Sequence, residues 1–313
     1  MWIERNLFAT CTSGLCNRLL LLAGSMRIAA ETRRSLAVYW PVNEALGCSF
    51  EELFVNRFDM VTEAEFGHIL KTNFNVKVYN AWRTDEPDYR AVRRDGDPTA
   101  HIVIIKGWSD PRFENETHSN ELDAAVRRRL LELRPRPAIE DLVGAYPLPP
   151  ACIGVHVRRG DNLEGFGASK EEHFFRLMRR VLELRPETTF FLATDVEAVE
   201  ERFRAEFSQA LVSAPKQWAA RQTVQGVREG LIDLLLLART TGIIGNVQSS
   251  FSLTAAKLGA RTMFVADESN AGDRLEKTCA ALISCLPVQS GSPVSIQPGT
   301  FGPAAFPLPQ PPA

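Results

Sequence analysis

The 313-residue chain lacks an excess of charge of either sign. It has 36 Lys and Arg residues against 38 Asp and Glu residues, which gives a net charge of −2. Proteins that bind nucleic acid carry a basic surface, so this balance gives no reason to expect a nucleic-acid partner. The composition, 45% hydrophobic and 24% charged, is typical of a globular protein, and the length is enough for two domains.

The chain also lacks a long uncharged apolar run. A membrane span takes about 20 apolar residues, and the most apolar stretch, residues 231–237, contains Asp233. No basic segment followed by an apolar run opens the chain, as a secretory signal would. We therefore expect no membrane span and a cytoplasmic location. A buried Asp233 would need a partner, for which Arg221 and Arg228 are candidates, in a structural ion pair.

Paired metal-binding cysteines are absent as well. The six cysteines are scattered along the chain without a Cys-x-x-Cys pair. Cys152 lies within an apolar, strand-like stretch, where a cysteine behaves as a small hydrophobic residue. Reduced thiols are the expected state of all six.

Alternating strands and helices dominate the second half of the chain. Its apolar runs and helical periodicities predict a parallel, doubly wound sheet. The expected strands are 151–157, 189–193, 210–213, 242–246 and 261–266, and the expected helices are 169–185, 196–207, 222–239, 250–258 and 273–285.

The first half begins with a similar unit. A strand at 6–10, a loop, a helix at 17–33 and a strand at 36–40 are expected, followed by an irregular region at 41–99 with a short helix at 49–54. Three prolines at 147–150 make a stiff connection, where we place a domain boundary. The predicted units are 1–148, 149–286 and a loosely ordered, Pro-rich tail at 287–313.

The most informative stretch is residues 151–161, an apolar strand that ends in Arg158, Arg159, Gly160 and Asp161. Parallel strands place their carboxyl ends at the ligand crevice. Successive side chains point to opposite faces, so one arginine can face the crevice while the other braces the strand end against a carboxylate such as Asp161. The planar fork of arginine suits a diphosphate. The alternatives to phosphate binding are that the arginines form a surface ion pair at the strand end and that Asp161 only closes a turn with Gly160.

A second candidate is the loop that runs from Thr12 to Arg18 and enters the first helix. Small residues before a helix N-terminus create an anion site from backbone N–H groups and the helix dipole. The alternative is a capped helix start, because Thr12, Ser13 and Asn17 are all good cap residues.

Three stretches in order resemble the motifs of the α1,2-/α1,6-/protein-O-fucosyltransferase superfamily. They are His156-Val157-Arg158-Arg159-Gly160-Asp161, then Phe190-Phe191-Leu192-Ala193-Thr194-Asp195, then Ser249-Ser250-Phe251-Ser252. The N-terminal loop resembles the superfamily's Gly-x-x-Asn loop. The resemblance covers roughly residues 5 to 266, and it implies a GT-B-like α/β fold in which two Rossmann-like domains face a cleft.

The resemblance also implies roles for individual residues. Arg158, at the arginine common to all branches of the superfamily, and Asn17 are the implied catalytic residues. The implied GDP-sugar-binding residues are Gly14, Arg18, His156, Arg159, Asp161, Asp195, Ser249, Ser250 and Phe251. Asp195 would lie at the guanine end and the two serines near the β-phosphate. The alternatives are that His156 is a hydrogen-bonded core histidine, and that Asp195 and Ser249 only cap helices.

The implied activity is transfer of fucose from GDP-fucose to a glycan or another hydroxyl acceptor, by an inverting and metal-independent reaction. Transferases that hold a metal often use Asp-x-Asp at a strand end, whereas Asp95-Gly96-Asp97 lies in a charged loop. We therefore expect no metal and no cofactor besides the donor. The alternatives are another nucleotide sugar and a nucleotide-sugar-binding protein without turnover. Trp40, Trp82, Tyr89 and Trp108 are candidates for lining an acceptor cleft.

Overall fold

The computed structural model describes residues 5–72, 75–81, 91–159 and 169–287. Its elements in the first half are β1 (Asn6–Thr10), α1 (Leu15–Thr32), β2 (Ser35–Tyr39), β3 (Asp59–Met60), α2 (Glu63–Thr72), β4 (Val76–Ala81), β5 (Ile102–Gly107), α3 (Asn120–Glu132) and α4 (Pro137–Ala145). The second half contains β6 (Cys152–Val157), α6 (Glu171–Leu184), β7 (Thr189–Thr194), α7 (Glu197–Phe207), η1 (Ser208–Ala210), β8 (Leu211–Val212), α8 (Val224–Arg239), β9 (Ile243–Gly245), α9 (Ser250–Gly259), β10 (Met263–Val265) and α10 (Gly272–Ser284).

The strands form two five-stranded parallel sheets. The first has the order β3-β2-β1-β5-β4 and the second the order β10-β9-β6-β7-β8. Strand order reverses direction between β1 and β5 in the first sheet and between β6 and β9 in the second. In sheets of this kind a ligand binds outside the carboxyl ends of the strands at such a switch point. The predicted α/β fold with a doubly wound second sheet is confirmed.

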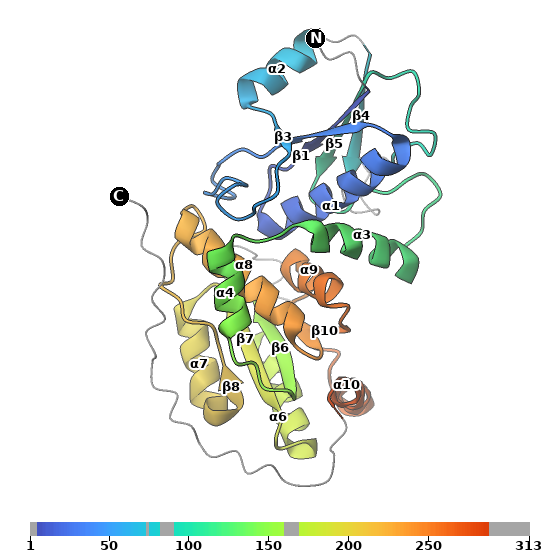
Figure 1. The fold of residues 1–313 in the computed structure, drawn as a ribbon. Coiled ribbons are helices and arrows are strands. Elements are labelled where there is room, and N and C mark those ends of the chain that lie inside the picture. The colour runs from blue at the N-terminus through green and yellow to red at the C-terminus, as the bar shows by residue number, and fades with distance from the viewer. Residues whose placement is uncertain (1–4, 73–74, 82–90, 160–168, 288–313) are drawn as a thin grey trace.

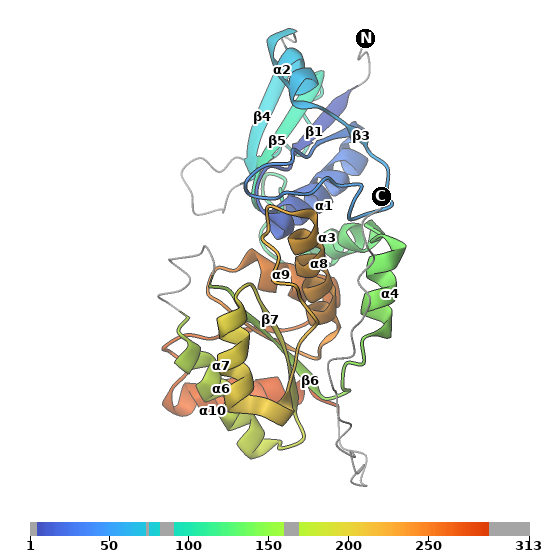
Figure 2. The ribbon, with the colours of Figure 1, turned by 90° about the vertical axis from the view of Figure 1, so that its left-hand side faces the viewer.

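Helices cover both faces of the second sheet. Alternate residues of β6 divide between the two faces, as strand geometry requires. Ile153 and Val155 pack with α6, α7 and α10, while Cys152 belongs to the core shared with α8 and α9. Figures 1 and 2 show the two sheets one above the other, with α1 and α3 of the upper half and α8 and α9 of the lower half in the middle of the molecule.

One hydrophobic core runs through both halves. It joins buried residues of β1 and α1 to residues of α8 and α9, such as Leu237 and Ala255. Helix α4 packs against α8 of the second half, and the Tyr146 hydroxyl donates to the carbonyl of Ser213 at 2.9 Å. The polypeptide therefore crosses to the second half before the proline connection, so the boundary at residue 148 does not coincide with the packing of α4.

Buried charges lie within the same contact between the halves. Lys257 of α9 is 6% exposed and forms an ion pair with Asp123 of α3, and its Nζ lies 4.0 Å from Oδ2 of the buried Asp110. Arg127 Nε donates to the carbonyl of Leu258 at 3.0 Å. A buried ion pair is costly to break because the remaining charge is left without a partner. These contacts fix α3 against α9.

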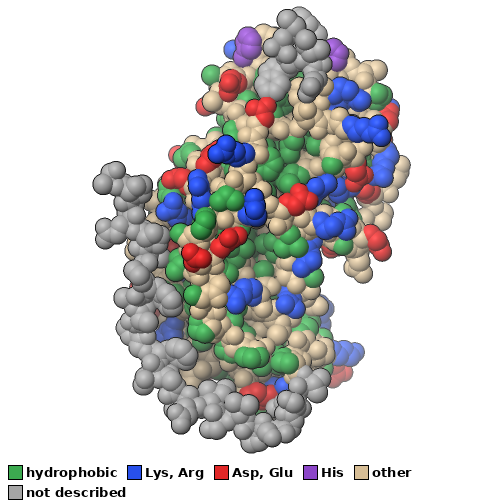
Figure 3. Space-filling model, in the orientation of Figure 1, with side chains coloured by type: hydrophobic (Ala, Val, Ile, Leu, Met, Phe, Trp, Pro, Cys, Tyr) green, Lys and Arg blue, Asp and Glu red, His purple; other side chains and the backbone are tan. Residues whose placement is uncertain are grey.

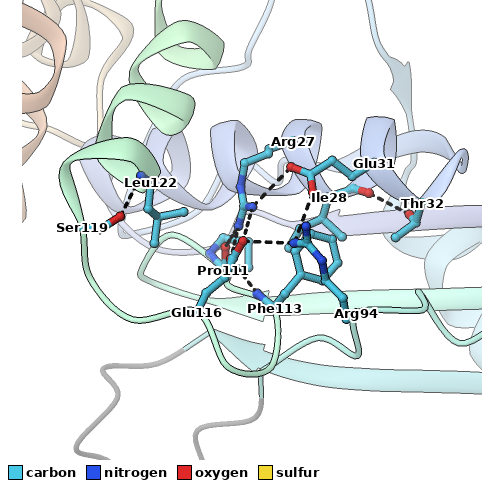
Figure 4. Close-up of polar contacts among 10 residues, drawn as sticks. All are labelled: Arg27, Ile28, Glu31, Thr32, Arg94, Pro111, Phe113, Glu116, Ser119 and Leu122. Atoms are coloured by element: carbon cyan, nitrogen blue, oxygen red, sulfur yellow. Dashed lines mark hydrogen bonds and ion pairs between the residues drawn. The ribbon is translucent and has the colours of Figure 1, made fainter.

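A second cluster holds the segment between β5 and α3 (Figure 4). Arg27 of α1 makes two hydrogen bonds to the carboxylate of Glu116, at 2.9 and 2.8 Å. Glu116 also accepts from the backbone N–H of Phe113, and the guanidinium groups of Arg27 and Arg94 lie over the Phe113 ring. Paired Arg–carboxylate bonds fix geometry as well as charge, so this segment has a defined path along α1.

The outer surface mixes charges of both signs. On the face drawn in Figure 3, Lys and Arg side chains alternate with Asp and Glu side chains, in line with the small net charge. Within the described ranges, no helix is both long and apolar enough to cross a membrane.

Two local predictions were wrong. Residues 49–54 form turns instead of a helix, and Phe50 and Phe54 are buried against each other, 5.0 Å apart between ring centroids. The region 41–99 contains strand β3 and helix α2, which were not predicted. Helix α2 begins with Thr62 and Glu65 in a capping arrangement, in which Thr62 N donates to Glu65 and Glu65 N to Thr62 Oγ1. That Thr-x-x-Glu signal was present in the sequence.

The loop at residues 43–47 contacts the second half through its backbone. Gly47 N donates to the carbonyl of Arg221 at 3.0 Å, and Gln222 Nε2 donates to the carbonyl of Glu44 at 3.2 Å. A Cβ added to Gly47 would overlap the carbonyl group of Gln222. Only glycine permits this close approach between the two backbones.

Gly47→Ala should therefore destabilise the protein, because neither backbone can yield without separating the halves. We expect the free energy of unfolding, measured by urea unfolding, to fall by about 1–3 kcal/mol, the usual cost of overpacking. Gly67→Ala is the matched control, since a Cβ there meets nothing within 4 Å and the residue lies inside α2. It should be neutral or stabilising. Equal stability of the two variants would show that the Gly47 contact carries no constraint.

Candidate functional site

The candidate site in the second half lies at the switch point between β6 and β9. Arg158 follows the last residue of β6, and Asn246 follows the last residue of β9. The Arg158 backbone N–H donates to Asn246 Oδ1 at 2.8 Å. Asn246 is fully buried, and its Nδ2 has no hydrogen-bond partner in the described part of the chain. Sequence reasoning missed Asn246, although a polar residue directly after an apolar strand is the same signal that singled out Arg158.

The two arginines after β6 have different environments. Arg159 is held by its own half: Nη1 donates to the Arg158 carbonyl at 3.0 Å, Nη2 donates to the Ser169 carbonyl at 2.6 Å, and Nε lies 3.8 Å from Glu171. Its side chain is 5% exposed, and burial lowers its pKa. Arg159 is therefore the arginine that braces the end of β6. Arg158 has the parity of His156, and its charge acts on both His156 and Cys16 of helix α1.

His156 is buried between β6 and the start of α9. Its Nδ1 lies 2.8 Å from Ser252 Oγ and 3.4 Å from Ser249 Oγ, and its ring stacks on Phe251 with 4.5 Å between centroids. Burial lowers the His156 pKa to about 3, and the charges of Arg158, Lys216 and Arg159 act in the same direction. His156 is therefore neutral at physiological pH and positions the first turn of α9.

That first turn is built by the Ser-Ser-Phe-Ser motif. Ser249 is the N-cap residue, and its Oγ accepts from Ser252 N at 3.4 Å. Ser250 is the first helical residue, and its hydroxyl makes no hydrogen bond with any residue that the structure describes. Ser249 thus performs the capping role expected as one alternative. The N-terminal N–H groups of α9 and the Ser250 hydroxyl are donors of the kind that can hold an anion.

The N-terminal loop places Gly14 at the N-cap of α1. Its φ and ψ are −67° and 167°, and no side chain caps the helix, so the capping interpretation of Thr12, Ser13 and Asn17 was wrong. A Cβ at Gly14 would meet nothing within 4 Å. Asn17 is half-buried in the first turn and its side chain makes no hydrogen bond with described residues. The start of α1 therefore presents uncapped N–H groups with the Asn17 amide beside them, an arrangement that can hold an anion.

Arg18 shapes this loop from inside. It is 0% exposed, and its guanidinium donates to the carbonyls of Ser13, Pro41 and Thr12 and to Asn43 Oδ1. The guanidinium also lies 5.0 Å from the centroid of the buried Trp40 ring. Burial lowers the pKa of Arg18 to about 10. Direct contact between Arg18 and the GDP-sugar donor stays a prediction. The hydrogen bonds of the guanidinium to the loop and to Asn43 disfavour it.

The starts of α1 and α9 lie close together at the boundary between the halves. Helices α1 and α9 pack together, and Cys16 in the first turn of α1 lies beside Thr254 in the second turn of α9. Burial raises the Cys16 pKa to about 12, against the opposing effects of Thr254 and the Arg158 charge. The candidate residues thus come from three separate segments: Arg158 after β6, Gly14 and Asn17 at the start of α1, and Ser250 at the start of α9.

Two further predicted residues have other placements. Asp195 is exposed, and its Oδ1 accepts from the Arg159 backbone N–H at 2.9 Å. It does not cap α7, whose N-cap is Val196. Asp195 therefore supports the turn that carries the arginine pair. Asp161 lies outside the described residues.

Asp233 has a different partner from those expected. It pairs with Lys216, with 2.8 Å between Nζ and Oδ2, and both side chains are 5% exposed. Neither Arg221 nor Arg228 fills this role. Burial raises the Asp233 pKa to about 6, opposed by Lys216. Lys216 also donates to the carbonyl of Thr194 at 3.2 Å, so the pair ties the β8–α8 loop to the end of β7.

The Asp-x-Asp sequence is a structural feature far from the switch points. Asp97 hydrogen-bonds the Tyr79 hydroxyl, and Arg34 donates to the carbonyls of Gly96 and Asp97. Arg34 precedes β2 and also donates to Asn6 and His101. These residues lie at the amino ends of the strands, opposite the candidate site.

The described residues contain no group of three or more His, Cys, Asp or Glu side chains placed to hold a metal ion. All six cysteines are unpaired thiols, and five of them are buried. Two surface pockets, of about 400 and 410 Å³, lie beside β4 and between α6 and α10. Neither is lined by a predicted site residue.

Comparison with solved structures shows that the fold is similar to those of several fucosyltransferases. The fold is similar to that of NodZ alpha-1,6-fucosyltransferase soaked with GDP-fucose, with 19% identity, a TM-score of 0.58, and coverage of 86% of this chain and 97% of the other. It is also similar to a mutant of Arabidopsis thaliana FUT1 in complex with GDP, with 15% identity, a TM-score of 0.56, and coverage of 84% and 70%. The apo form of POFUT1 has 13% identity and a TM-score of 0.50, with coverage of 84% of this chain and 98% of the other.

Scans of protein-family models and of curated protein sequences gave no match. The structural likeness establishes the fold: the chain has the GT-B architecture of these fucosyltransferases, as the sequence motifs predicted.

The buried His156 generates a pH prediction. Its pKa is about 3 in the folded protein, against an ordinary value of 6.5, so below pH 6.5 the unfolded chain binds a proton that the folded protein does not. The stability that His156 contributes is fully present above pH 6.5. Below pH 6.5 it decreases as the pH falls, by up to about 1.4 kcal/mol per pH unit.

His156→Gln removes this titration. The variant should be less stable than the natural chain at pH 7, because the ring stack is lost. By pH 5 the difference should shrink by about 2 kcal/mol, measured by urea unfolding at each pH. Parallel pH profiles for the two proteins would contradict the assignment of a neutral, buried His156.

Proposed function

We propose that the protein is a glycosyltransferase that takes fucose from GDP-fucose and transfers it to a hydroxyl group of a glycan or another acceptor. The observation that carries the proposal is that the N-termini of α1 and α9 lie close together, with the Arg158 charge acting on Cys16 in the first turn of α1 and on His156 beside the start of α9. Each N-terminus attracts an anion, and together they fit a diphosphate with two negatively charged groups.

The reaction needs charge stabilisation more than a covalent intermediate. As the bond between sugar and β-phosphate breaks, negative charge grows on the leaving diphosphate. Preorganised N–H groups and an arginine placed where this charge develops lower the barrier. In our proposal Arg158 and the start of α9 with Ser250 hold the β-phosphate. Gly14 leaves room at the start of α1, and the Asn17 amide faces the transferred sugar.

The choice of GDP and fucose rests on the motifs and on the structural likeness. The NodZ structure was soaked with GDP-fucose, and the Arabidopsis thaliana FUT1 structure is a complex with GDP. We further propose an inverting reaction without a metal ion, in which Arg158 takes the role of the cation. Lysine at that position would keep the charge but lose the paired hydrogen bonds. We also propose that the protein acts in the cytoplasm.

The donor assignment can be tested by thermal shift. A ligand that binds only the folded protein raises its melting temperature by mass action. GDP and GDP-fucose should raise it more than UDP, and the shift should persist in EDTA. Release of GDP from GDP-fucose on addition of an acceptor would separate an enzyme from a binding protein without turnover. Equal shifts with GDP and UDP would exclude the guanine assignment, and a shift abolished by EDTA would exclude metal independence.

The arginine pair offers a matched test of the mechanism. Arg158→Lys should fold normally and lower turnover by roughly 10²–10³, the usual loss for one preorganised transition-state contact. Arg159→Lys loses bonds that brace the strand end, so it should lower the melting temperature and reduce turnover less. Both variants are compared by melting temperature and by GDP release. Near-full turnover in Arg158→Lys, or a loss explained by its unfolding, counts against Arg158 as the phosphate arm.

A further inference from the structure

The loop at residues 213–223, between β8 and α8, contains a tryptophan in an unusual backbone conformation. Trp218 has a φ of +55°, in the left-handed region that bulky residues rarely adopt. Such strain persists only where the surroundings impose it, and it is common at ligand sites. Trp218 is also partly exposed and, among the residues that the structure describes, it belongs to none of the three hydrophobic cores. The strained conformation therefore does not serve to bury the indole in a core.

Glu229 of α8 fixes the backbone on both sides of Trp218. Its carboxylate accepts from the backbone N–H of Gln217 at 2.9 Å and from that of Ala219 at 3.3 Å. Glu229 is 6% exposed, and Gln225 Nε2 donates to the same carboxylate at 2.9 Å. Hydrogen bonds to an ionised carboxylate are stronger than those between neutral groups. The buried carboxylate therefore holds Trp218 in its left-handed conformation.

Lys216 sets the position of the indole ring. Its Nζ lies 5.0 Å from the centroid of the Trp218 ring, within the range of a cation–π contact. The same Nζ lies 2.8 Å from Oδ2 of Asp233 and donates to the carbonyl of Thr194 at 3.2 Å. Thr194 is the last residue of β7. The indole therefore lies beside the carboxyl end of β7.

The carboxyl end of β7 lies next to the groups that bind the diphosphate in our proposal. Strand β7 is the neighbour of β6, and Arg158 follows β6. Burial and the nearby charges of Arg158 and Lys216 lower the pKa of His156, whose ring stacks on Phe251 in the first turn of α9. Strand β8 lies two strand spacings from β6, about 10 Å. A nucleotide that lies along this edge, with its phosphates at α9, thus extends its base toward Trp218.

The rest of the loop packs on the start of α8. Thr223 is the N-cap residue, and its Oγ1 accepts from Gly226 N at 3.1 Å. A Cβ on Gly226 would overlap the carbonyls of Ala219 and Ala220, which directly follow Trp218. The backbone around Trp218 is therefore held from Glu229 and from the helix start. A side chain that is preorganised in this way loses little conformational freedom when a ligand binds.

We propose that the Trp218 indole stacks on the base of the donor nucleotide, and that the loop at residues 213–223 is a preformed wall of the base-binding pocket. This inference rests on the proposed transferase function and names the residue that gives affinity for the base. Lys216 lies on the ring, and no other cation and no other aromatic ring contacts the indole within the described ranges. Every nucleobase has a π-face, so stacking favours a base as a class. The choice of guanine is left to hydrogen-bonding groups.

The test compares two probes by calorimetric titration of the full chain: GDP, which carries a base, and inorganic pyrophosphate, which does not. Trp218→Ala should weaken GDP binding roughly tenfold or more, the usual effect of losing one base–aromatic stack. It should leave pyrophosphate binding unchanged. Trp218→Tyr keeps an aromatic ring and should restore most of the GDP affinity. If Trp218→Ala does not fold, Trp218→Leu replaces it.

Gln217→Ala is the matched control, because Gln217 is the exposed neighbour of Trp218 in the same loop. It should bind GDP as the natural chain does. The melting temperature of each variant without ligand shows whether the variant is folded.

The two probes separate the stacking proposal from the proposed function. Stacking is overturned if Trp218→Ala binds GDP as tightly as the natural chain, or if it loses GDP and pyrophosphate binding alike, as a purely structural role would require. It is also overturned if the natural chain binds GDP no more tightly than pyrophosphate. A natural chain that binds neither GDP nor another nucleoside diphosphate contradicts the proposed function itself.

Discussion

Helices α1 and α9 pack against each other across the boundary between the two sheets, and every group of the candidate site is placed relative to that contact. Cys16 in the first turn of α1 lies next to Thr254 in the second turn of α9. Each helix begins at a switch point of its own sheet, so this contact brings two dipole ends together. Like ends repel unless an anion lies between them. The pairing is therefore favourable when a ligand of opposite charge is bound.

Other contacts across the boundary offset the electrostatic repulsion between the two positive helix ends. The apolar core is continuous from β1 through α1 to α8 and α9. Lys257 with Asp123 and Asp110 closes the side next to α3, and the Gly47–Arg221 backbone bond closes the side next to the β8–α8 loop. Arg18 connects this second side to the loop at residues 12–18 through Asn43. The contacts between the halves and the shape of that loop are thus one connected network.

Local patterns in the sequence were sufficient for the parts of the site that depend on local geometry. Strand alternation predicted that one of the two arginines braces the strand end, as Arg159 does, whereas the phosphate-binding role of Arg158 stays a prediction. The Ser249–Phe251 stretch was placed correctly at a helix N-terminus. Partner choice was harder, because it depends on tertiary packing. Lys216 reaches Asp233 from a loop, so no spacing on the helix of Asp233 could reveal it. Burial was misjudged for Arg18 and Trp40, which stack on each other inside the N-terminal half.

The continuous core also has a consequence for synthesis of the chain. The first half is made before α8 and α9, so the apolar face of α1 and α3 has no partner until about residue 259 has left the ribosome. A nascent chain in this state exposes a surface of the kind that chaperones bind. The two halves are therefore poor units for recombination: exchanging one between proteins of this fold would succeed only when the surfaces of α1, α3, α8 and α9 were exchanged as a matched set.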